Sequence, residues 1–232
     1  MAHFESPQRS RGRILVFTTA PLVNTPEAET VEISRIAPVM VLPNTLLFPD
    51  SLLPLFIFEE RYRAMLAWAL ENDRMFCMAL MRQGREDWTS TDDFHHIAGL
   101  GLIRASVARE DGTSHLILQG VARVKFIRFV QTEPFVMAEF RELPAVSAVP
   151  EDAATLSAIV LKLCAQFRER GFELPEALEN QFNSASDAGT LSDLVAHTLL
   201  RDPYRRQSVL EASDVSTRLR TLIGHLREEL SS

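Results

Sequence analysis

The side chains of this sequence that could do chemistry are few, and they form no recognised catalytic or metal-binding pattern. The best candidate metal site is His95 and His96 in the segment TDDFHHIAG, close to Asp92 and Asp93. Adjacent side chains on a strand point to opposite faces, so the two histidines would be poor joint ligands. Neither H-x-x-x-H nor C-x-x-C spacing supports them. We therefore expect a structural or solvated role for this pair, and neither a metal nor a cofactor.

The candidate nucleophiles and phosphate-binding loops are equally isolated. His115, His197 and His225 are not accompanied by a nucleophile motif such as G-x-S-x-G. The segment GLG at 99–101 does not extend to G-x-G-x-x-G, because residue 104 is arginine, and no glycine is followed by lysine. A hydrolase whose groups meet only in three dimensions is left open. We expect no catalytic residue, no enzymatic activity and independence of ATP.

The composition is that of a globular protein with no strongly charged segment. Hydrophobic residues make up 46% of the 232 residues, charged residues 24%, and the formal net charge is −7. Without a basic arm, neither nucleic acid nor an anionic membrane is an expected partner. Cys77 and Cys164 each lie in an apolar run and are expected to be small buried residues rather than a disulfide framework. No run approaches the length of a membrane helix, and the ILVF cluster at 14–17 lacks a cleavage site, so we expect a cytoplasmic protein.

From residue 36 to residue 147 the pattern predicts mostly β-strands. Asp-Gly in EDGT at 110–113 predicts a tight hairpin, and Gly120 predicts a bulge or bend in a curled sheet. One helix is expected over 59–73, because two glutamates precede residues with helical apolar spacing. The expected strands are the short runs PVMVL, LPLFIF, MFCMALM, GLGLIRASVA, SHLILQG, VARVKFIRFV and FVMAEFREL.

From residue 148 to residue 232 the apolar spacing becomes helical. Thr190 followed by Asp193 imitates a capping box before LSDLVAHTLL, and the last helix carries one continuous apolar stripe. Residues 1–35 are expected to be an arm with at most one extra strand, RILVFTT. The predicted class is therefore α+β: a curled or barrel-like, β-rich N-terminal domain that carries one helix, followed by an all-helical bundle domain.

Several segments, in order, resemble a known family. VLPNTLLFPDSLLPLFIFEERYRAML (41–66) is similar to the first segment of the Lon N-terminal domain family, the substrate-binding domain of Lon-type proteases. DFHHIAGLGLIRA and DGTSHLILQGVARVKF resemble the segments that follow, with Gly120 and Arg123 where the family's pattern favours them. LSDLVAHTL resembles a helix of the family, with Ser192 where alanine is common, and RRQSVLEASDVSTRLRTLIGHLREEL resembles its last segment. The resemblance covers residues 37–230.

The resemblance implies a six-stranded, curled β domain that carries a helix, followed by a helical bundle. It also implies contact with unfolded or degron-bearing polypeptides. Lon-type proteases continue into an ATPase domain and a serine–lysine protease domain, whereas neither Lys125 nor Lys162 has a protease-like context. We therefore expect a stand-alone N-domain protein that lacks the ATPase and protease domains.

The expected contact residues are large apolar side chains in polar or turn-like surroundings. Phe48, Leu52 and Leu53 flank the trio Pro49-Asp50-Ser51, which has the chemistry of a surface turn. Trp88 lies in the polar loop RQGREDWTSTDD, and exposed tryptophans are frequent binding anchors. The alternative is that the first segment fills a curled sheet and that Trp88 folds back onto its own domain.

These observations lead to two principal hypotheses of different classes. The first is a non-catalytic module that binds unfolded or damaged polypeptides, with an adaptor role toward a protease or chaperone as one form of it. The second is a small-molecule or peptide sensor that uses the groove between the two domains. A homodimer through the 1–35 arm or the last helix is left open.

Overall fold

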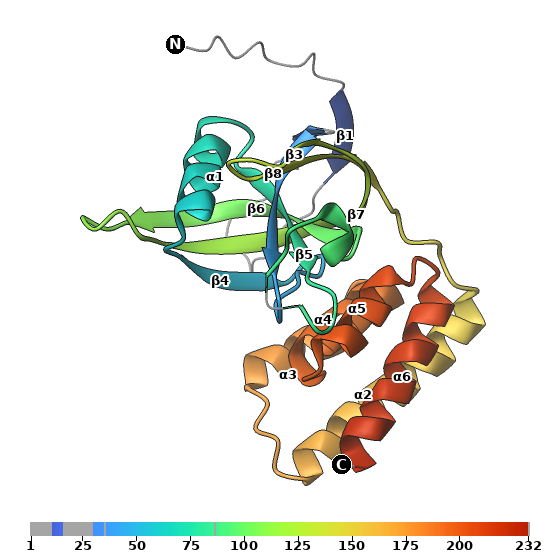
Figure 1. Cartoon of the computed structure of the whole chain (residues 1–232). Helices are drawn as coiled ribbons and strands as arrows, with labels where there is room; N and C mark the ends of the chain where they lie inside the picture. Colours follow the sequence, from blue (N-terminus) through green and yellow to red (C-terminus); the bar gives the residue numbers. More distant parts are fainter. Residues whose placement is uncertain (1–10, 16–29, 35, 86, 232) are drawn as a thin grey trace, which may run out of the picture.

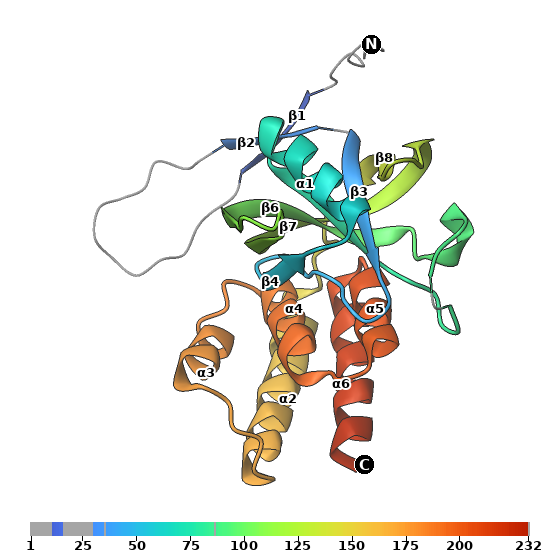
Figure 2. The ribbon, with the colours of Figure 1, turned by 60° about the vertical axis from the view of Figure 1, so that its left-hand side comes forward.

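A curled sheet and a group of helices are the two parts of the chain in the computed structural model, which describes residues 11–15, 30–34, 36–85 and 87–231 (Figures 1 and 2). Both views place the helices that follow residue 149 against one end of the sheet. The strands of the sheet are β3 (Ile36–Leu42), β4 (Leu52–Ile57), β5 (Met75–Leu80), β6 (Ile97–Ala108), β7 (Ser114–Gln131) and β8 (Val136–Glu142). The helices are α1 (Glu60–Glu71), α2 (Pro150–Glu169), α3 (Glu176–Asn183), α4 (Ala188–Leu199), α5 (Pro203–Glu211) and α6 (Val215–Ser231).

The sheet curls because β7 is long enough to serve three partners. The strand order is β4-β7-β6-β5-β3-β8, and β8 also pairs with β7, which closes a ring of five strands. The sequence predicted two strands over 114–130, but β7 is one strand with a register shift between Gly120 and Ala122 where it pairs with β6. The bend predicted at Gly120 is therefore present within a continuous strand. β4 lies outside the ring and pairs with the first part of β7.

Gly120 also lets the loop before β4 lie directly against β7. A Cβ atom at this position would lie 1.9 Å from the carbonyl oxygen of Phe48. The backbone N–H of Gly120 donates to Ser51 O at 2.9 Å, and the N–H of Asp50 donates to Gly120 O at 3.0 Å. Asp50 adopts a φ of 62°, a left-handed conformation that aspartate tolerates better than most residues. These hydrogen bonds set the register in which β4 begins to pair with β7.

Helix α1 covers one side of the sheet as predicted from its apolar spacing. Tyr62, Met65, Leu66 and Ala69 are its buried residues. The Tyr62 hydroxyl donates to Val41 O at 2.6 Å, so the helix is also bonded to the backbone of β3. This buried hydrogen bond satisfies the one polar atom that the apolar face of α1 carries into the core.

The predicted helices after residue 148 are present, but one of their caps differs from the prediction. The N-cap of α4 is Asp187, whose carboxylate accepts a hydrogen bond from the backbone N–H of Thr190 at 2.9 Å. Thr190 was expected to be the cap and instead lies inside the helix. Aspartate caps a helix at least as well as threonine, so the helix begins at the earlier of the two residues.

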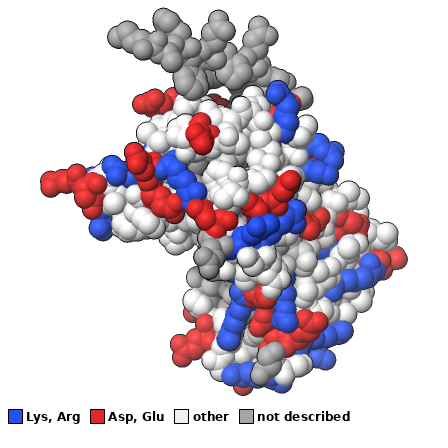
Figure 3. All heavy atoms as spheres, viewed as in Figure 1, with Lys and Arg blue, Asp and Glu red and all other residues white. Residues whose placement is uncertain are grey.

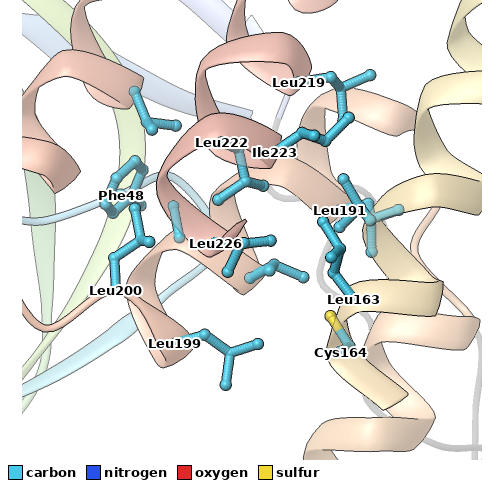
Figure 4. Close-up of a cluster of buried hydrophobic side chains, with 14 of the residues drawn as sticks. Phe48, Leu163, Cys164, Leu191, Leu199, Leu200, Leu219, Leu222, Ile223 and Leu226 are labelled. Atoms are coloured by element: carbon cyan, nitrogen blue, oxygen red, sulfur yellow. The ribbon is translucent and has the colours of Figure 1, made fainter. Parts of the chain in front are cut away.

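The helices do not have a hydrophobic core of their own. Their central cluster includes Leu46, Phe48 and Leu80 from the β-rich part, beside the leucines of α4 and α6 (Figure 4). The described residues therefore form an α+β structure with a six-stranded sheet and six α-helices, which does not confirm the helical bundle as a separate domain. Of the 1–35 arm, the described residues form a two-stranded antiparallel sheet, β1 (Arg11–Leu15) and β2 (Thr30–Ser34). The second half of the predicted strand RILVFTT lies outside the described residues.

Candidate functional site

The outer side of β4 and its neighbours presents apolar side chains without a covering element among the described residues. Along β4, Leu53, Leu55 and Ile57 turn toward the core, whereas Leu52, Pro54 and Phe56 are exposed. This alternation follows from the strand period of two. The surface is continued by β6 and β7. We call it the β4 face and define it as the outer side chains Leu52, Pro54, Phe56, Ala105, Val107, His115 and Ile117.

Strand register brings these side chains into two rows across the sheet. Pro54 lies opposite Ile117, which lies opposite Ala105. Phe56 lies opposite His115, which lies opposite Val107. Together with Leu55 and Leu116, these residues line a cavity of about 350 Å³. The rows form one open, mainly apolar hollow over three strands, large enough for several side chains of a ligand.

Three large apolar side chains of the β4 face are exposed to solvent. Leu52 is 57% exposed, Phe56 46% and Val107 65%. The Phe56 ring lies 4.8 Å from the His115 ring and 5.8 Å from that of Phe58. Single exposed apolar residues are ordinary on protein surfaces, but contiguous apolar patches more often mark interaction sites.

Positive charge borders this face. The guanidinium carbon of Arg109 lies 5.8 Å from the centroid of the Phe56 ring. Arg104 donates to the Gln119 side chain, and Gln119 lies opposite Leu52 in the strand register. The described residues of β4 and β6, and residues 114–119 of β7, include no Asp or Glu.

The structure separates the four contact residues predicted from sequence. Leu52 belongs to the β4 face, and Leu53 lies half-buried beneath it against the core. Phe48, one of the expected contact residues, is 0% exposed, so its ring belongs to the core and is not presented at the surface. The hydrogen bonds of Ser51 and Gly120 hold its loop against β7 and direct the ring toward the helices. Figure 4 shows Phe48 on the side of the cluster where Leu200 and Leu222 lie.

Trp88 does not join the β4 face. Its ring is half-buried and meets Phe94 edge-on at 6.2 Å, and the Arg61 guanidinium lies 5.4 Å from its centroid. It is not one of the residues that line the apolar cavity. The alternative, that this tryptophan folds back onto its own domain, describes its position in the structure.

Sequence reasoning missed Phe56, Val107 and His115. None of the three carried a usable signal. Positions 52–58 are all apolar or proline, so the pattern around Phe56 does not show which alternate set of side chains faces outward. The neighbourhood of Val107 and His115 depends on the pairing of β6 with β7 and of β7 with β4.

A second, polar cavity lies where the β-rich part meets the helices. Its volume is about 290 Å³, and Asp50, Glu142, Asp187, Arg123 and Arg218 are among the residues that line it. Burial raises the pKa of Asp50, and the nearby carboxylates of Asp193 and Asp187 raise it further. The acidic side chains of this cavity therefore repel one another where they are withdrawn from water.

A buried ion-pair network forms the wall of the polar cavity and joins the two parts of the chain. Arg123 of β7 donates to the Asp193 carboxylate of α4, which lies 3.5 Å from Arg218 of α6. Arg123 also donates to Leu210 O at 3.0 Å. All three charged side chains are buried. The Arg123 and Asp193 noticed in the sequence thus have a structural role at the junction.

The two adjacent histidines have separate partners. His95 Nδ1 lies 2.9 Å from a carboxylate oxygen of Glu211 in α5, whereas His96 Nε2 lies 2.8 Å from Thr91 O. The contact with His95 lowers the pKa of Glu211. Within the described residues, no group of three or more histidine, cysteine, aspartate or glutamate side chains is placed to hold a metal ion.

The surface charge is mixed on the face shown in Figure 3, where basic side chains are interspersed with acidic ones. Among the helices that the structure describes, none is long and apolar enough to cross a membrane. The β4 face, with its cavity of about 350 Å³, and the polar junction cavity, of about 290 Å³, are the two candidate sites.

Comparison with known proteins identifies relatives along nearly the whole chain. Residues 36–228 match the family model of the ATP-dependent protease La (LON) substrate-binding domain. The chain is 26% identical over 205 residues to a Lon protease of Dictyoglomus thermophilum, and 29% identical over 197 residues to Lon protease 2 of Herpetosiphon aurantiacus. These matches cover 87% and 83% of this chain but 25% and 24% of the relatives. The chain therefore spans about a quarter of the length of the curated relatives it matches.

Two solved structures share the fold. The N-terminal domain of a Mycobacterium avium complex Lon protease superposes with a TM-score of 0.67 at 20% identity, covering 83% of this chain and 98% of that one. A Lon N-terminal domain protein from Xanthomonas campestris gives a TM-score of 0.58 at 20% identity, with coverages of 82% and 97%. At this identity the likeness establishes the architecture.

Proposed function

The chain belongs to the family of the ATP-dependent protease La (LON) substrate-binding domain, and from this premise we propose that it recognises unfolded or degron-bearing polypeptide segments through the β4 face. The observation that carries the proposal is the contiguous apolar surface over three strands, with its cavity of about 350 Å³. Unfolded chains differ from folded ones chiefly in exposing apolar side chains. A shallow apolar surface can accept many such segments, since apolar contacts depend little on direction.

The chemistry of the site supports a binding role without catalysis. Of the residues that line the apolar cavity, His115 is the only one with a titratable side chain, and its ring packs on Phe56. The two cysteines are buried, and burial raises the pKa of the Cys164 thiol to about 12 and that of Cys77 further. Both are therefore thiols at neutral pH, which is the unreactive form. A recognition module of this kind would present clients to a protease or chaperone as an adaptor, or hold them itself.

A second candidate function rests on the polar cavity at the junction. Its mixture of Arg123 and Arg218 with Asp50, Glu142 and Asp187 could accept a small polar molecule or a charged peptide terminus. In this function the protein would be a sensor, with a compact and saturable ligand. The β4 face favours the first proposal, because the family is described by substrate binding and the substrates of a protease are polypeptides.

Fluorescence anisotropy tests the first proposal. A labelled client protein that is permanently unfolded is titrated with this protein in the absence of nucleotide. The same labelled client in its native, folded form is the control. We expect saturable binding of the unfolded form alone. Phe56→Ser should weaken it about tenfold, equivalent to about 1.4 kcal/mol, because the half-exposed ring loses its apolar contact with the client.

Ile127→Ser is the matched control. Ile127 is 57% exposed on β7, as exposed as Leu52, but does not line the cavity. Its substitution should leave the dissociation constant within about twofold. Equal weakening by both variants would mean that binding is not located at the β4 face. If the unfolded client does not bind at protein concentrations of tens of micromolar, the first proposal is contradicted. The second proposal, a small ligand in the polar junction cavity, would then be tested.

A further inference from the structure

The edge of β4 that faces away from β7 carries main-chain groups with no strand partner among the described residues. In the sheet order, β4 is a terminal strand and pairs with β7 alone. Long, apolar, unpaired edges are normally protected in soluble proteins, because any extended chain can pair with them. Pro54 protects the middle of this edge, whereas the positions on either side of it are apolar and can pair with an extended chain.

The phase of hydrogen bonding shows which residues face this open edge. Ser51 O accepts from Gly120 N at 2.9 Å, immediately before β4 begins. Bonded positions alternate along an antiparallel pair, so Leu53, Leu55 and Ile57 direct their main-chain groups toward β7. Leu52, Pro54 and Phe56 direct theirs to the open edge. Pro54, which has no N–H, occupies a position where β7 requires no donor, as proline does in edge strands.

We propose that a client segment binds in an extended conformation and adds to β4 as a further strand of the sheet. This inference rests on the proposed function and names its binding mode. The N–H groups of Leu52 and Phe56 and the carbonyls of Leu52, Pro54 and Phe56 would pair with the client main chain, and alternate client side chains would cover the β4 face. Strand addition explains tolerance of many sequences, because main-chain groups supply the hydrogen bonds and the apolar rows select only for apolar side chains.

Charge narrows the class of client. The protein as a whole carries a net charge of −7, yet two arginines, Arg104 and Arg109, lie at the border of the β4 face. Glu110 and Asp111 lie beyond Arg109 at the hairpin tip, and the Asp111 carboxylate already accepts from Thr113 N and Oγ1. The favoured occupant is therefore an extended segment with alternate apolar residues and an acidic residue next to them, rather than a basic one.

Peptide probes test the hydrogen bonds directly. We would measure anisotropy with a labelled ten-residue peptide of alternating Phe and Thr, flanked by Glu, and with the same peptide N-methylated at two adjacent central residues. Adjacent methyl groups block both edges of the strand while keeping every side chain. We expect N-methylation to weaken binding at least about tenfold, and replacement of the flanking Glu by Lys to weaken it about threefold at low salt.

Variants of β4 provide the matching test on the protein. Leu52→Ala removes the side chain, whereas Leu52→Pro also removes the outward N–H without removing a bond to β7. The proline variant should bind the unmethylated peptide about fivefold more weakly than the alanine variant. Circular dichroism and urea unfolding would establish that both are folded.

The outcomes separate the two proposals. If the methylated peptide binds as well as the parent, and Phe56→Ser still weakens both, strand addition is wrong and apolar recognition stands. If neither peptide nor unfolded protein binds, the proposed function itself fails. A dimer of the free protein that Leu52→Pro dissociates would assign the edge to a second copy of the chain, and would likewise overturn the proposal.

Discussion

Asp193 is the residue whose surroundings are most sensitive to a single change. Its carboxylate accepts from Arg123 and lies 3.5 Å from Arg218, and all three side chains are buried. Burial lowers the pKa of Arg218, while Asp193 opposes that shift. Two arginines withdrawn from water are compensated chiefly by this carboxylate, with smaller contributions to Arg218 from Asp187 and Asp214.

We expect Asp193→Ala to lower the free energy of unfolding by about 3–5 kcal/mol, because it leaves two buried cations without their counter-ion. Urea denaturation at neutral pH measures this change. The control is Asp152→Ala, whose partner Arg220 lies 3.4 Å away at the surface, and which should cost less than about 1 kcal/mol. Equal costs for the two variants would show that the network does not hold the junction.

At the scale of elements, the approach of the loop 46–51 to β7 decides how β4 is presented. The loop passes so close to Gly120 that the distance from a Cβ atom to Phe48 O would be 1.9 Å. The three nearest atoms, Phe48 O, Phe48 C and Pro49 Cα, all belong to the backbone, which cannot move aside as the end of a flexible side chain can. The loop carries Phe48 into the helical core on one side and begins β4 on the other.

Gly120→Ala should therefore destabilise the protein by about 1–3 kcal/mol or more, as expected when an added carbon forces a backbone shift. Gly224→Ala is the matched substitution, since its Cβ atom would meet nothing within 4 Å. It lies in α6, where alanine should be about 1 kcal/mol more favourable than glycine. Urea midpoints of the two variants should move in opposite directions, and a stabilised Gly120→Ala would contradict the packing described for the loop.

At the scale of the whole molecule, the sheet and the helices share a core and a buried ion-pair network. Leu46, Phe48 and Leu80 pack among the leucines of the helices. Arg123 of β7 donates hydrogen bonds to Asp193 of α4 and to the carbonyl oxygen of Leu210 near the end of α5. Neither part can lose its structure without exposing apolar surface of the other.

We accordingly expect a single cooperative unfolding transition. Trp68 and Trp88, the two tryptophans of the chain, both lie in the β-rich part, so their fluorescence reports on the sheet. Circular dichroism at 222 nm reports mainly on the helices. The two urea midpoints should coincide within error. Two separated transitions would instead support the helices as an independent domain.

Much of the fold was predictable because local patterns and the final structure agree. The helix over 59–73, the hairpin at 110–113, the bend at Gly120 and the helical character of the chain after residue 148 all follow from apolar spacing, turn residues and caps. The errors occurred where two local signals competed. Asp187 and Thr190 are both good caps, and the continuity of β7 through Gly120 depends on its partners β6 and β8 rather than on its own residues.

The candidate site was only partly predictable. Leu52 was predicted because it directly follows the turn Pro49-Asp50-Ser51, and it is exposed. Phe48 directly precedes the same turn and was chosen by the same reasoning, but it is buried. Sequence shows that a side chain is apolar without showing which of two apolar environments it enters. Phe48 had a helical core available across the junction, which no local pattern could reveal.

The sequence by itself determined the family, the α+β class, the order of the elements and the position of an apolar segment around β4. These properties depend on residue types at short spacing, such as strand alternation, helix periodicity and glycine in bends. Only the tertiary structure decided that Leu52, Phe56, Val107 and His115 form one surface, because they come from three strands joined by long-range register. It alone also decided that Phe48 is core and that the outer edge of β4 has no strand partner among the described residues, since burial and edge position follow from what packs alongside.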